Sequence, residues 1–516
     1  MPHATNLFAT AVPDGAGLRL GAPHGPVAAS VKQVNSARDY GSQRFKRSIR
    51  PAHPPVQRPV CEPFPHGVGA PRRPVAASVK HVNRARDYGS QRFKRSIRPA
   101  QPPVQRPACE TFPDGAALRP GFPAVAALDQ PWLARHVIAT RKDDAMPASR
   151  PPLFIGGEIY RGSTYGAKHP LAIPRISTVI DLSRAMGWLP DAVYRDTHVA
   201  SEAEILRFHS ADYVAALRRA EAEQRVDAET GARYNLGKME NPIFAEMYRR
   251  PATSVGSTLQ AARLLLAGEA DVVYAPAGGT HHARAGRASG FCYFNAPVLG
   301  ILDLLDQGVE RVLYVDLDAH HGDGVEEAFA DDDRVLTISV HEDGRWPYTG
   351  KAEDRAGGMA RNLPMPPGFN DSEMAYAMRE AILPLGRAFA PQILMIQTGA
   401  DALAEDPLSR LELSNRALWD AVADLLPLAP KTLVVGGGGY NPWSVGRCWA
   451  GIWAVLNGVN PMTPLTPEAE AILRGLTWQR AAGRNPPERW FTTLADDRRP
   501  GPVREEVRRV VGMVVL

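Results

Sequence analysis

The feature that most constrains the fold is an alternation of short apolar runs with longer helical stretches, which begins at Pro151. The runs are β-branched or wholly apolar, as strands buried on both faces are. They span residues 271–275, 311–317, 335–341, 392–398 and 432–435, and helical stretches occupy 253–267, 371–390, 415–426 and 443–457. This alternation predicts an α/β fold with a parallel sheet and helices on both sides. In such sheets, ligands bind beyond the carboxyl ends of the strands.

A tandem repeat sets the first part of the chain apart. Near-identical segments begin at Pro26 and Pro74, a period of 48 residues (74 − 26). The segments are rich in proline and poor in large apolar side chains, and two copies are too few for a solenoid. We therefore expect residues 1–145 to be disordered, apart from a short helix in each repeat. The alternative is that Met146 is the native start and the repeat is upstream sequence.

The charge is divided unevenly along the chain. Residues 1–150 hold 23 Lys and Arg against 9 Asp and Glu, whereas residues 151–516 hold 37 against 46. The net charge of +5 is therefore +14 in the first part and −9 in the second. A basic arm suits nucleic acid or an anionic membrane surface, and the alternative is a basic tail without a specific partner.

Cysteine content and hydropathy indicate the cellular setting. Four cysteines (Cys61, Cys109, Cys292 and Cys448) are too few and too scattered for a disulfide framework or a cysteine-based metal site. No apolar run is long enough to span a membrane, and the first residues do not resemble a secretory signal. We expect a cytoplasmic protein with no membrane segment.

The most informative segment is RVLYVDLDAHHGDG, in which an apolar run leads directly into Asp316, Asp318, His320, His321 and Asp323. Buried carboxylates are costly unless they are paired or bind a metal. Side chains two residues apart on an extended chain share a face, so Asp316, Asp318 and His320 can converge. Asp318 and His320 suit direct zinc ligation, and Asp316 suits a supporting position. The alternative is an Asp- and His-rich turn held by local hydrogen bonds.

Three further segments carry candidate site residues. QTGAD ends in Asp401, which completes an Asp–His–Asp zinc site with an open position, or else caps a helix. GGTHHAR carries His281 and His282, which need carboxylates to orient them, or else lie exposed in a loop. GGGGYNP carries Tyr440, which either donates its hydroxyl to a developing oxyanion or caps a tight turn. The glycines lack phosphate-binding spacing.

Together and in this order, the DLDAHHGDG, QTGAD, GGTHHAR and GGGGY segments resemble the histone deacetylase family, including acetoin-utilisation-like and acetylpolyamine-amidohydrolase-like bacterial members. The resemblance covers roughly residues 155–460. It implies an arginase-like three-layer fold with a central eight-stranded parallel sheet. It also implies one zinc ion held by Asp318, His320 and Asp401.

The same resemblance implies roles for other residues. His282 is expected as general base and then acid, with His281 as its electrostatic partner, and Asp323 and Asp316 as their respective orienting carboxylates. Tyr440 would stabilise the oxyanion. The acyl-lysine channel would contain Gly290, Phe291, Trp346 and Leu408, and Arg175 would lie near an acetate exit pocket. Asp316, Ser339 and nearby backbone oxygens would hold potassium.

Two departures from the family pattern bear on substrate choice. Relatives often carry an Asp that holds the substrate backbone, and this chain has Glu240 there, with a longer reach. A Phe–Phe pair near the rim is replaced by Arg345 and Trp346, which would narrow the channel mouth and change its charge.

The sequence therefore predicts three regions: a disordered part (1–145), a deacetylase domain (150–462) and a helical tail packed on it (463–516). The predicted activity is zinc-dependent removal of acetyl groups from acetyl-lysine or from acetylated polyamines and other small amines. One alternative is an arginase- or agmatinase-type ureohydrolase with two manganese ions, although QTGAD offers only one carboxylate. Another is a non-catalytic binding protein. The oligomeric state is not predicted.

Overall fold

The computed structural model describes residues 150–515, so the predictions for residues 1–145, including the repeat, the basic arm, Cys61 and Cys109, lie outside it. The strands are β1 (Leu153–Gly156), β2 (Tyr194–Asp196), β3 (Val272–Ala275), β4 (Val312–Asp316), β5 (Val335–Glu342), β6 (Ala360–Met365), β7 (Ile393–Gln397) and β8 (Lys431–Val435). Within this part of the chain they form one eight-stranded sheet in the order β2-β1-β3-β8-β7-β4-β5-β6. Every neighbouring pair is parallel, which confirms the predicted sheet.

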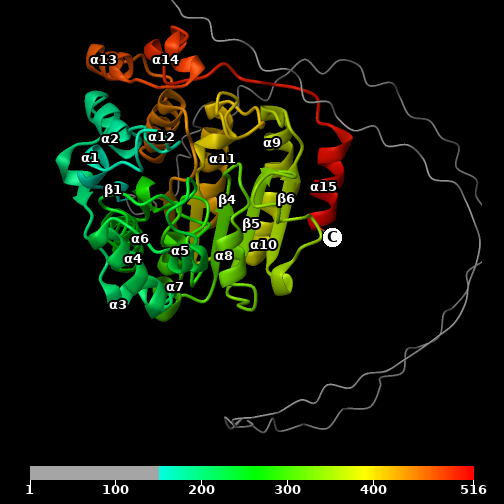
Figure 1. The fold of residues 1–516 in the computed structure, drawn as a ribbon. Coiled ribbons are helices and arrows are strands. Elements are labelled where there is room, and N and C mark those ends of the chain that lie inside the picture. The colour runs from blue at the N-terminus through cyan, green and yellow to red at the C-terminus, as the bar shows by residue number, and fades with distance from the viewer. Residues whose placement is uncertain (1–149, 516) are drawn as a thin grey trace, which may run out of the picture. The chain divides into compact units, whose positions relative to one another are not determined.

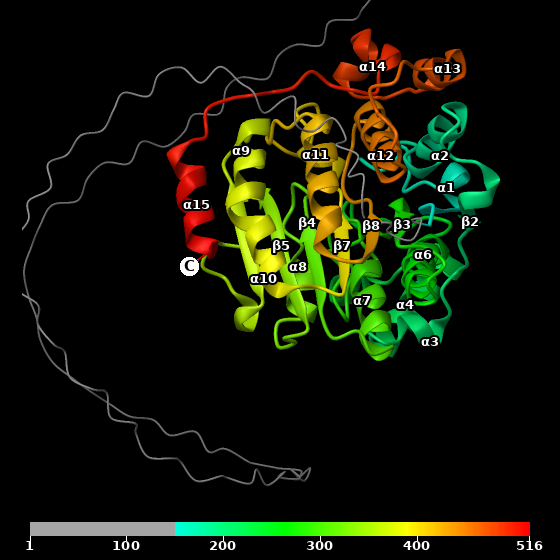
Figure 2. The same cartoon turned by 180° about the vertical axis from the view of Figure 1, so that it is seen from behind.

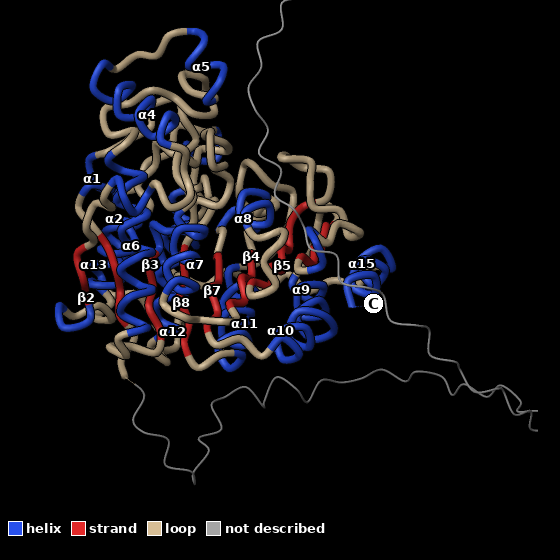
Figure 3. The backbone as a smooth tube through the Cα atoms, turned by 90° about the horizontal axis from the view of Figure 1, so that it is seen from below, coloured by secondary structure: helices blue, strands red, loops and turns tan. Residues whose placement is uncertain are grey.

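Helices cover both faces of the sheet (Figures 1 and 2). In chain order they are α1 (Ile159–Gly162), α2 (Ile176–Ala185), α3 (Glu202–Ile205), α4 (Ala211–Glu223), α5 (Ala228–Tyr234), α6 (Arg249–Leu266), α7 (Ala296–Asp306), α8 (Asp323–Ala328), α9 (Asp371–Ala377), α10 (Leu383–Phe389), α11 (Asn415–Leu425), α12 (Pro442–Leu456), α13 (Pro467–Gly475), α14 (Arg489–Thr492) and α15 (Glu505–Val515). Helices α6, α7 and α8 lie on one face, and α2, α9, α10, α11 and α12 lie on the other. Figure 3 shows the strands in a row between these layers.

Strand β4 shows why the central strands consist almost wholly of apolar residues. All five of its residues are buried. Leu313 and Val315 belong to the core shared with α9, α11 and α12, whereas Val312 and Tyr314 belong to the core shared with α6 and α7. Because successive side chains of a strand point to opposite faces, a strand between two helix layers has no side for polar residues.

The strand order places late segments at the centre of the sheet. Strands β1, β2 and β3 form one side, and β4, β5 and β6 form the other. Strands β7 and β8 then return to fill the space between β3 and β4. This reversal of strand order is the position at which open α/β sheets bind ligands.

The helical stretch predicted at 371–390 is interrupted. Helix α9 is followed by a π-helical turn at Met378–Ile382 and then by α10. Pro384 lies at the start of α10, where it has no N–H to donate and its ring would meet the carbonyl of the preceding turn in a regular helix. The wider turn directly before Pro384 accommodates this.

The C-terminal elements share the main core. Leu473 of α13, Trp490 of α14 and Val511 of α15 are buried in the same cluster as residues of α9, α11 and α12. Helix α15 lies beside β6, the outermost strand (Figure 1). None of the helices described between residues 150 and 515 combines the length and the apolar character needed to cross a bilayer.

Candidate functional site

The carboxyl ends of three central strands bring the candidate residues together. Asp316, the last residue of β4, pairs with Gln397 at the end of β7, and Gln397 pairs with Val435 at the end of β8. Three loops leave the sheet from this level. They carry Asp318 and His320 after β4, Asp401 after β7, and the glycine-rich segment with Tyr440 after β8. The site is therefore built from segments distant in sequence that parallel pairing aligns.

Asp318, His320 and Asp401 form one compact cluster. One potential ligand atom from each lies within 4.8 Å of the others, and all three residues are buried. His320 Nδ1 is 2.9 Å from Asp401 Oδ2 and 3.2 Å from Asp318 Oδ1. The other oxygens accept backbone hydrogen bonds, Asp318 Oδ2 from Gly438 at 2.5 Å and Asp401 Oδ1 from Ala319 at 3.0 Å. The three ligand atoms are thus fixed toward one point.

The cluster fits a divalent metal ion. A tetrahedral ion with bonds of about 2.0–2.2 Å would hold its ligand atoms about 3.3–3.6 Å apart, close to the observed spacing. Burial together with the charge of Asp318 raises the pKa of Asp401. Burial disfavours the charged form of His320 too, but hydrogen bonds to Asp318 and Asp401 outweigh it and raise its pKa to about 10. Two buried carboxylates in contact require a positive charge, which either a proton or a metal ion provides.

His281 is the first of two histidines beside this cluster. It follows β3, and its Nδ1 lies 2.7 Å from Asp316 Oδ2. Asp316 also accepts hydrogen bonds from the Tyr314 hydroxyl at 2.8 Å and from the Asp318 amide at 3.0 Å. Burial disfavours the imidazolium, but the charges of Asp316 and Asp318 outweigh it and raise the pKa of His281 to about 9.

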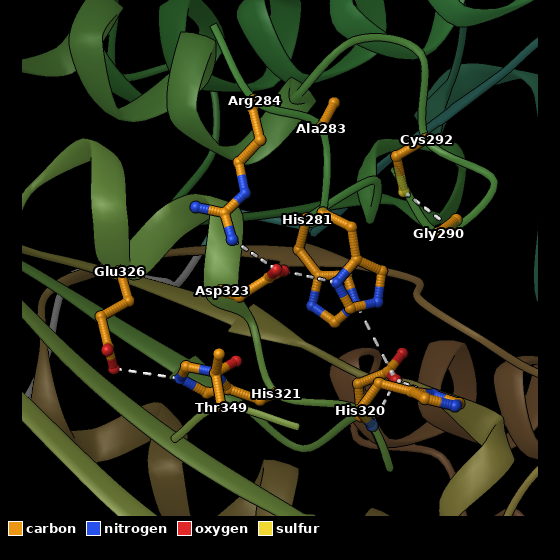
Figure 4. A network of polar contacts seen from close by, with 12 residues as sticks. His281, Ala283, Arg284, Gly290, Cys292, His320, His321, Asp323, Glu326 and Thr349 are labelled. Carbon is orange, nitrogen blue, oxygen red and sulfur yellow. Dashed lines mark hydrogen bonds and ion pairs between the residues drawn. The ribbon is translucent and has the colours of Figure 1, made fainter. Parts of the chain in front are cut away.

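His282 lies against His281, with ring centroids 3.9 Å apart. Its Nδ1 is 2.7 Å from Asp323 Oδ1, and Arg284 donates to the other oxygen of Asp323 at 2.7 Å. Figure 4 shows Asp323 between Arg284 and the imidazole rings. Burial and the charge of His281 lower the pKa of His282 to about 4. Burial opposes ionisation of Asp323, but its hydrogen bond with His282 and the positive charges around it together outweigh burial and lower the pKa of Asp323 to about 2.

Tyr440 comes from the glycine-rich segment after β8. A side chain at Gly438 would collide with Asp401, so glycine is needed for this close approach. Asn441 then caps α12 by accepting hydrogen bonds from the next two free amides, and Pro442 occupies the first helical position. Burial raises the pKa of Tyr440 well above its usual value, so its hydroxyl stays protonated.

One cleft, with a volume near 590 Å³, reaches this group of residues. Its lining includes His282, His320 and Tyr440 together with five residues predicted for the channel: Glu240, Gly290, Phe291, Trp346 and Leu408. The Trp346 ring lies 4.7 Å from the His282 ring. A side chain at Gly290 would collide with both rings. Glycine is therefore required at this point of the wall.

Both carboxylate oxygens of Glu240 accept hydrogen bonds from neighbouring residues. Oε1 accepts the Gly290 amide at 2.7 Å, and Oε2 accepts from Asn235 at 3.2 Å. Glu240 thereby fixes the loop that carries Gly290 and Phe291. Holding a substrate backbone is a second role, and it stays a prediction.

Arg175 and Ser339 also lie outside the cleft lining. Arg175 donates from Nη1 to the Gly437 carbonyl at 2.7 Å, and its guanidinium lies 5.2 Å from the centre of the Trp449 ring. It thus supports the glycine-rich segment from behind. Ser339 is the register neighbour of Asp316 in β5, and its hydroxyl is 2.9 Å from His341 Nδ1. The potassium site stays a prediction.

Sequence reasoning missed several supporting residues. Asp406 is buried and accepts the amides of Tyr440 at 2.6 Å and Leu408 at 2.9 Å. Burial and the charge of Asp401 raise the pKa of Asp406 to about 8. Arg284, in the GGTHHAR segment, and Tyr314, within β4, were also given no role. Their closeness in the sequence to the candidate residues was the one feature that could have indicated a role for them.

Residues 169–456 match the histone deacetylase domain model. The acetoin utilization protein AcuC of Bacillus subtilis (strain 168) is 34% identical over 331 residues, which cover 62% of this chain and 85% of that protein. Histone deacetylase 8 of Xenopus tropicalis is 37% identical over 291 residues, covering 55% of this chain and 78% of the relative.

A solved structure shows the same likeness in three dimensions. The crystal structure of an HDAC homolog from Aquifex aeolicus superposes with a TM-score of 0.68 at 35% identity. The match covers 71% of this chain and 100% of that chain.

Proposed function

The chain belongs to the histone deacetylase family, and on that premise we propose that it is a zinc-dependent amidohydrolase that removes acetyl groups from acetyl-lysine or from acetylated small amines. One observation carries the proposal. The Asp318–His320–Asp401 cluster reaches, through His320, the cleft that His282 and Tyr440 also line. Metal ligands, a base and an oxyanion donor around one reacting centre are what metal-assisted amide hydrolysis requires.

Asp318, His320 and Asp401 would hold the metal ion. Two carboxylates and one imidazole with an open fourth position form a donor set typical of catalytic zinc. A bound zinc ion supplies Lewis-acid chemistry, which polarises a carbonyl and makes a water molecule more acidic. We also assign Asp316 and Ser339 to a supporting potassium site, which their adjacent positions on β4 and β5 favour.

The two histidines would divide the proton transfers. Because His282 donates from Nδ1 to Asp323, its Nε2 is the free base on the cleft side, and it takes the proton of the attacking water. The charge on His281 would stabilise the negative charge that develops on the carbonyl oxygen as water attacks. The His282 imidazolium formed in this way then protonates the leaving amine.

Tyr440 would stabilise the oxyanion. Its hydroxyl remains a donor because burial opposes its ionisation. Asp406 holds its amide and thereby fixes the start of the side chain. Phe291 and Trp346 would enclose the aliphatic part of the substrate, and Leu408 would line the channel edge. Arg175 would lie on the exit route of acetate, behind the glycine-rich segment.

Acetate release tests the proposal. The purified chain is assayed on an acetyl-lysine peptide and on an acetylated polyamine, before chelation, after chelation and after return of zinc. Activity is expected to disappear with the metal and to return with about one zinc ion per chain. Asp401→Asn, which removes one carboxylate ligand, should lose both metal and activity.

The same measurements separate the alternatives. Two manganese ions per chain and urea release would indicate a ureohydrolase, but the cluster found in residues 150–515 offers three ligands for a single ion. Metal binding without acetate release would indicate a binding protein. The proposal fails if chelation removes the metal and leaves acetate release unchanged.

A cytoplasmic location is part of the proposal. Cys292 and Cys448 are both buried and unpaired, which suits a reducing compartment. Fractionation of the source cells would test it.

A further inference from the structure

Tyr348 is an unusual residue at the cleft. It lines the cleft together with Trp346, yet 73% of its surface is exposed. Its φ of 66° lies in the left-handed region, where residues other than glycine are disfavoured. An exposed tyrosine gains nothing from packing that would offset this strain. Strained residues of this kind concentrate where a ligand is held.

The loop that carries Tyr348 is fixed at several points. The Tyr348 amide donates to the Arg345 carbonyl at 2.7 Å, and Arg345 pairs with Glu342 at 2.5 and 2.9 Å. Thr349 Oγ1 lies 2.8 Å from His321 Nδ1, a contact visible in Figure 4. The ring therefore projects from a preorganised loop, so that little ordering entropy is lost when a ligand contacts it.

The position of Tyr348 relative to Trp346 limits what can reach it. Trp346 packs against His282 and so belongs to the depth of the cleft. The exposed Tyr348 ring belongs to its mouth. An acylated amine no longer than a lysine side chain would end before the mouth, whereas a lysine within a polypeptide continues past it. An aromatic ring at that level offers a flat apolar surface to a peptide chain.

We propose that Tyr348 determines specificity by contacting the polypeptide on either side of the acetylated lysine, so that the substrate class is protein acetyl-lysine rather than free acetylated amines. This inference rests on the proposed deacetylase function and narrows it.

Replacement of Tyr348 by glycine tests the inference. Tyr348→Gly removes the ring and relieves the left-handed strain, so the variant is expected to fold and to melt no lower than wild type. Steady-state kinetics are measured on an acetyl-lysine hexapeptide and on N-acetylputrescine. KM for the peptide should rise about tenfold with kcat nearly unchanged, while the parameters for the small amine stay constant. Tyr348→Phe, which keeps the ring, should retain the wild-type KM.

A second glycine substitution controls for the backbone effect. Ala390 also has a left-handed φ (51°). It lies between α10 and β7, at the amino-terminal ends of the strands and so opposite the cleft. Ala390→Gly should relieve strain in the same way and change KM for neither substrate.

The outcomes are separable. Acetate release from neither substrate by the wild-type chain contradicts the proposed function itself. If the wild type is active, an unchanged peptide KM in Tyr348→Gly, or an equal rise for both substrates, overturns the assignment of Tyr348. A higher wild-type kcat/KM for N-acetylputrescine than for the peptide overturns the assigned substrate class.

Discussion

Adjacent residues in the cleft differ in charge because their neighbours differ. His281 and His282 are both buried, but His281 faces the charges of Asp316 and Asp318, whereas His282 faces the charge of His281. The pKa of the first is raised and that of the second lowered. Identical side chains one residue apart can therefore serve as a fixed charge and as a base.

Loss of the Tyr440 hydroxyl should affect the chemical step. Tyr440→Phe keeps the ring but removes the donor to the oxyanion, so kcat is expected to fall about 10²–10³-fold. Metal content, measured by elemental analysis, should stay at the wild-type level because Tyr440 lies outside the Asp–His–Asp cluster. Near-normal turnover by this variant would contradict the role.

Asp406 should act through Tyr440. In Asp406→Asn, an amide replaces one acceptor oxygen, so the amide of Tyr440 or of Leu408 loses its partner. We expect kcat to fall about tenfold. Asp420→Asn, which breaks an exposed ion pair on α11, is the matched control.

A double variant distinguishes positioning from an independent effect. If Asp406 only positions Tyr440, the double variant Tyr440→Phe/Asp406→Asn should be little slower than Tyr440→Phe. Fully additive losses would mean that Asp406 acts by another route.

The residues visible from sequence were those with an unusual local context. Asp316, Asp318 and His320 follow an apolar strand directly, and burial of such groups requires a ligand. Asp406 has no comparable context, because its partner Tyr440 is 34 residues away and is reached only after the chain folds. Polar residues that interrupt an apolar run can be recognised from the sequence alone. A residue whose partner is distant in the sequence cannot.

Among the elements, α12 is connected to the C-terminal segment by an ion pair whose arginine is buried. Arg447 is fully buried, donates to the Thr493 carbonyl at 2.7 Å, and pairs with Asp496 at 2.7 Å. Asp496 also accepts the Asn415 amide at the start of α11. One carboxylate thus joins two helices and the segment after α14.

Removal of that carboxylate should be costly. Asp496→Ala leaves a buried guanidinium without a counter-charge and should lower the free energy of unfolding by about 3–5 kcal/mol, measured by urea denaturation. The double variant Arg447→Met/Asp496→Ala should recover a large part of the loss, because no buried charge remains. Equal stability of the single and double variants would contradict this account.

The strands predicted from sequence are buried on both faces, although β1, whose four residues are all buried, was not predicted. Strands β3, β4, β5, β7 and β8 coincide with the apolar runs, which confirms those predictions. Strand β2 has three residues and none is buried, and β6 mixes Arg361 and Asn362 with apolar side chains. Edge strands contact fewer neighbours, so burial leaves a weaker pattern on them. Strand order has no local signature.

At the scale of the whole molecule, stability should depend on pH through buried neutral histidines. His209 Nε2 accepts the Asn295 amide at 3.0 Å, so a proton there would oppose a donor. Burial lowers the pKa of His209 to about 4, and burial with the charge of His321 lowers that of His341 to about 3. In the unfolded chain both titrate near 6.5.

Acid should therefore destabilise the protein before its carboxylates titrate. Because the folded-state pKa values lie below the unfolded one, the stabilisation is complete above about pH 6.5 and is lost as the pH falls toward 4. His209 alone would account for about 3 kcal/mol. Urea unfolding of the metal-free protein at several pH values measures this. His209→Gln should lose less stability than the wild type between pH 7 and 5, and an equal loss in the two proteins would refute the argument.

The order of the strands also governs how the chain can be assembled during synthesis. Strands β3 and β4 leave the ribosome early, but the strands that pair between them are β7 and β8, which end at Val435. Until then the nascent chain holds two partial sheets, each with an unpaired edge prone to aggregation. Asp401 and Tyr440 arrive with the same two strands. Closure of the sheet and completion of the Asp318–His320–Asp401 cluster are therefore expected to be a single late event, and a chain shorter than this would lack the cluster and leave both edges unpaired.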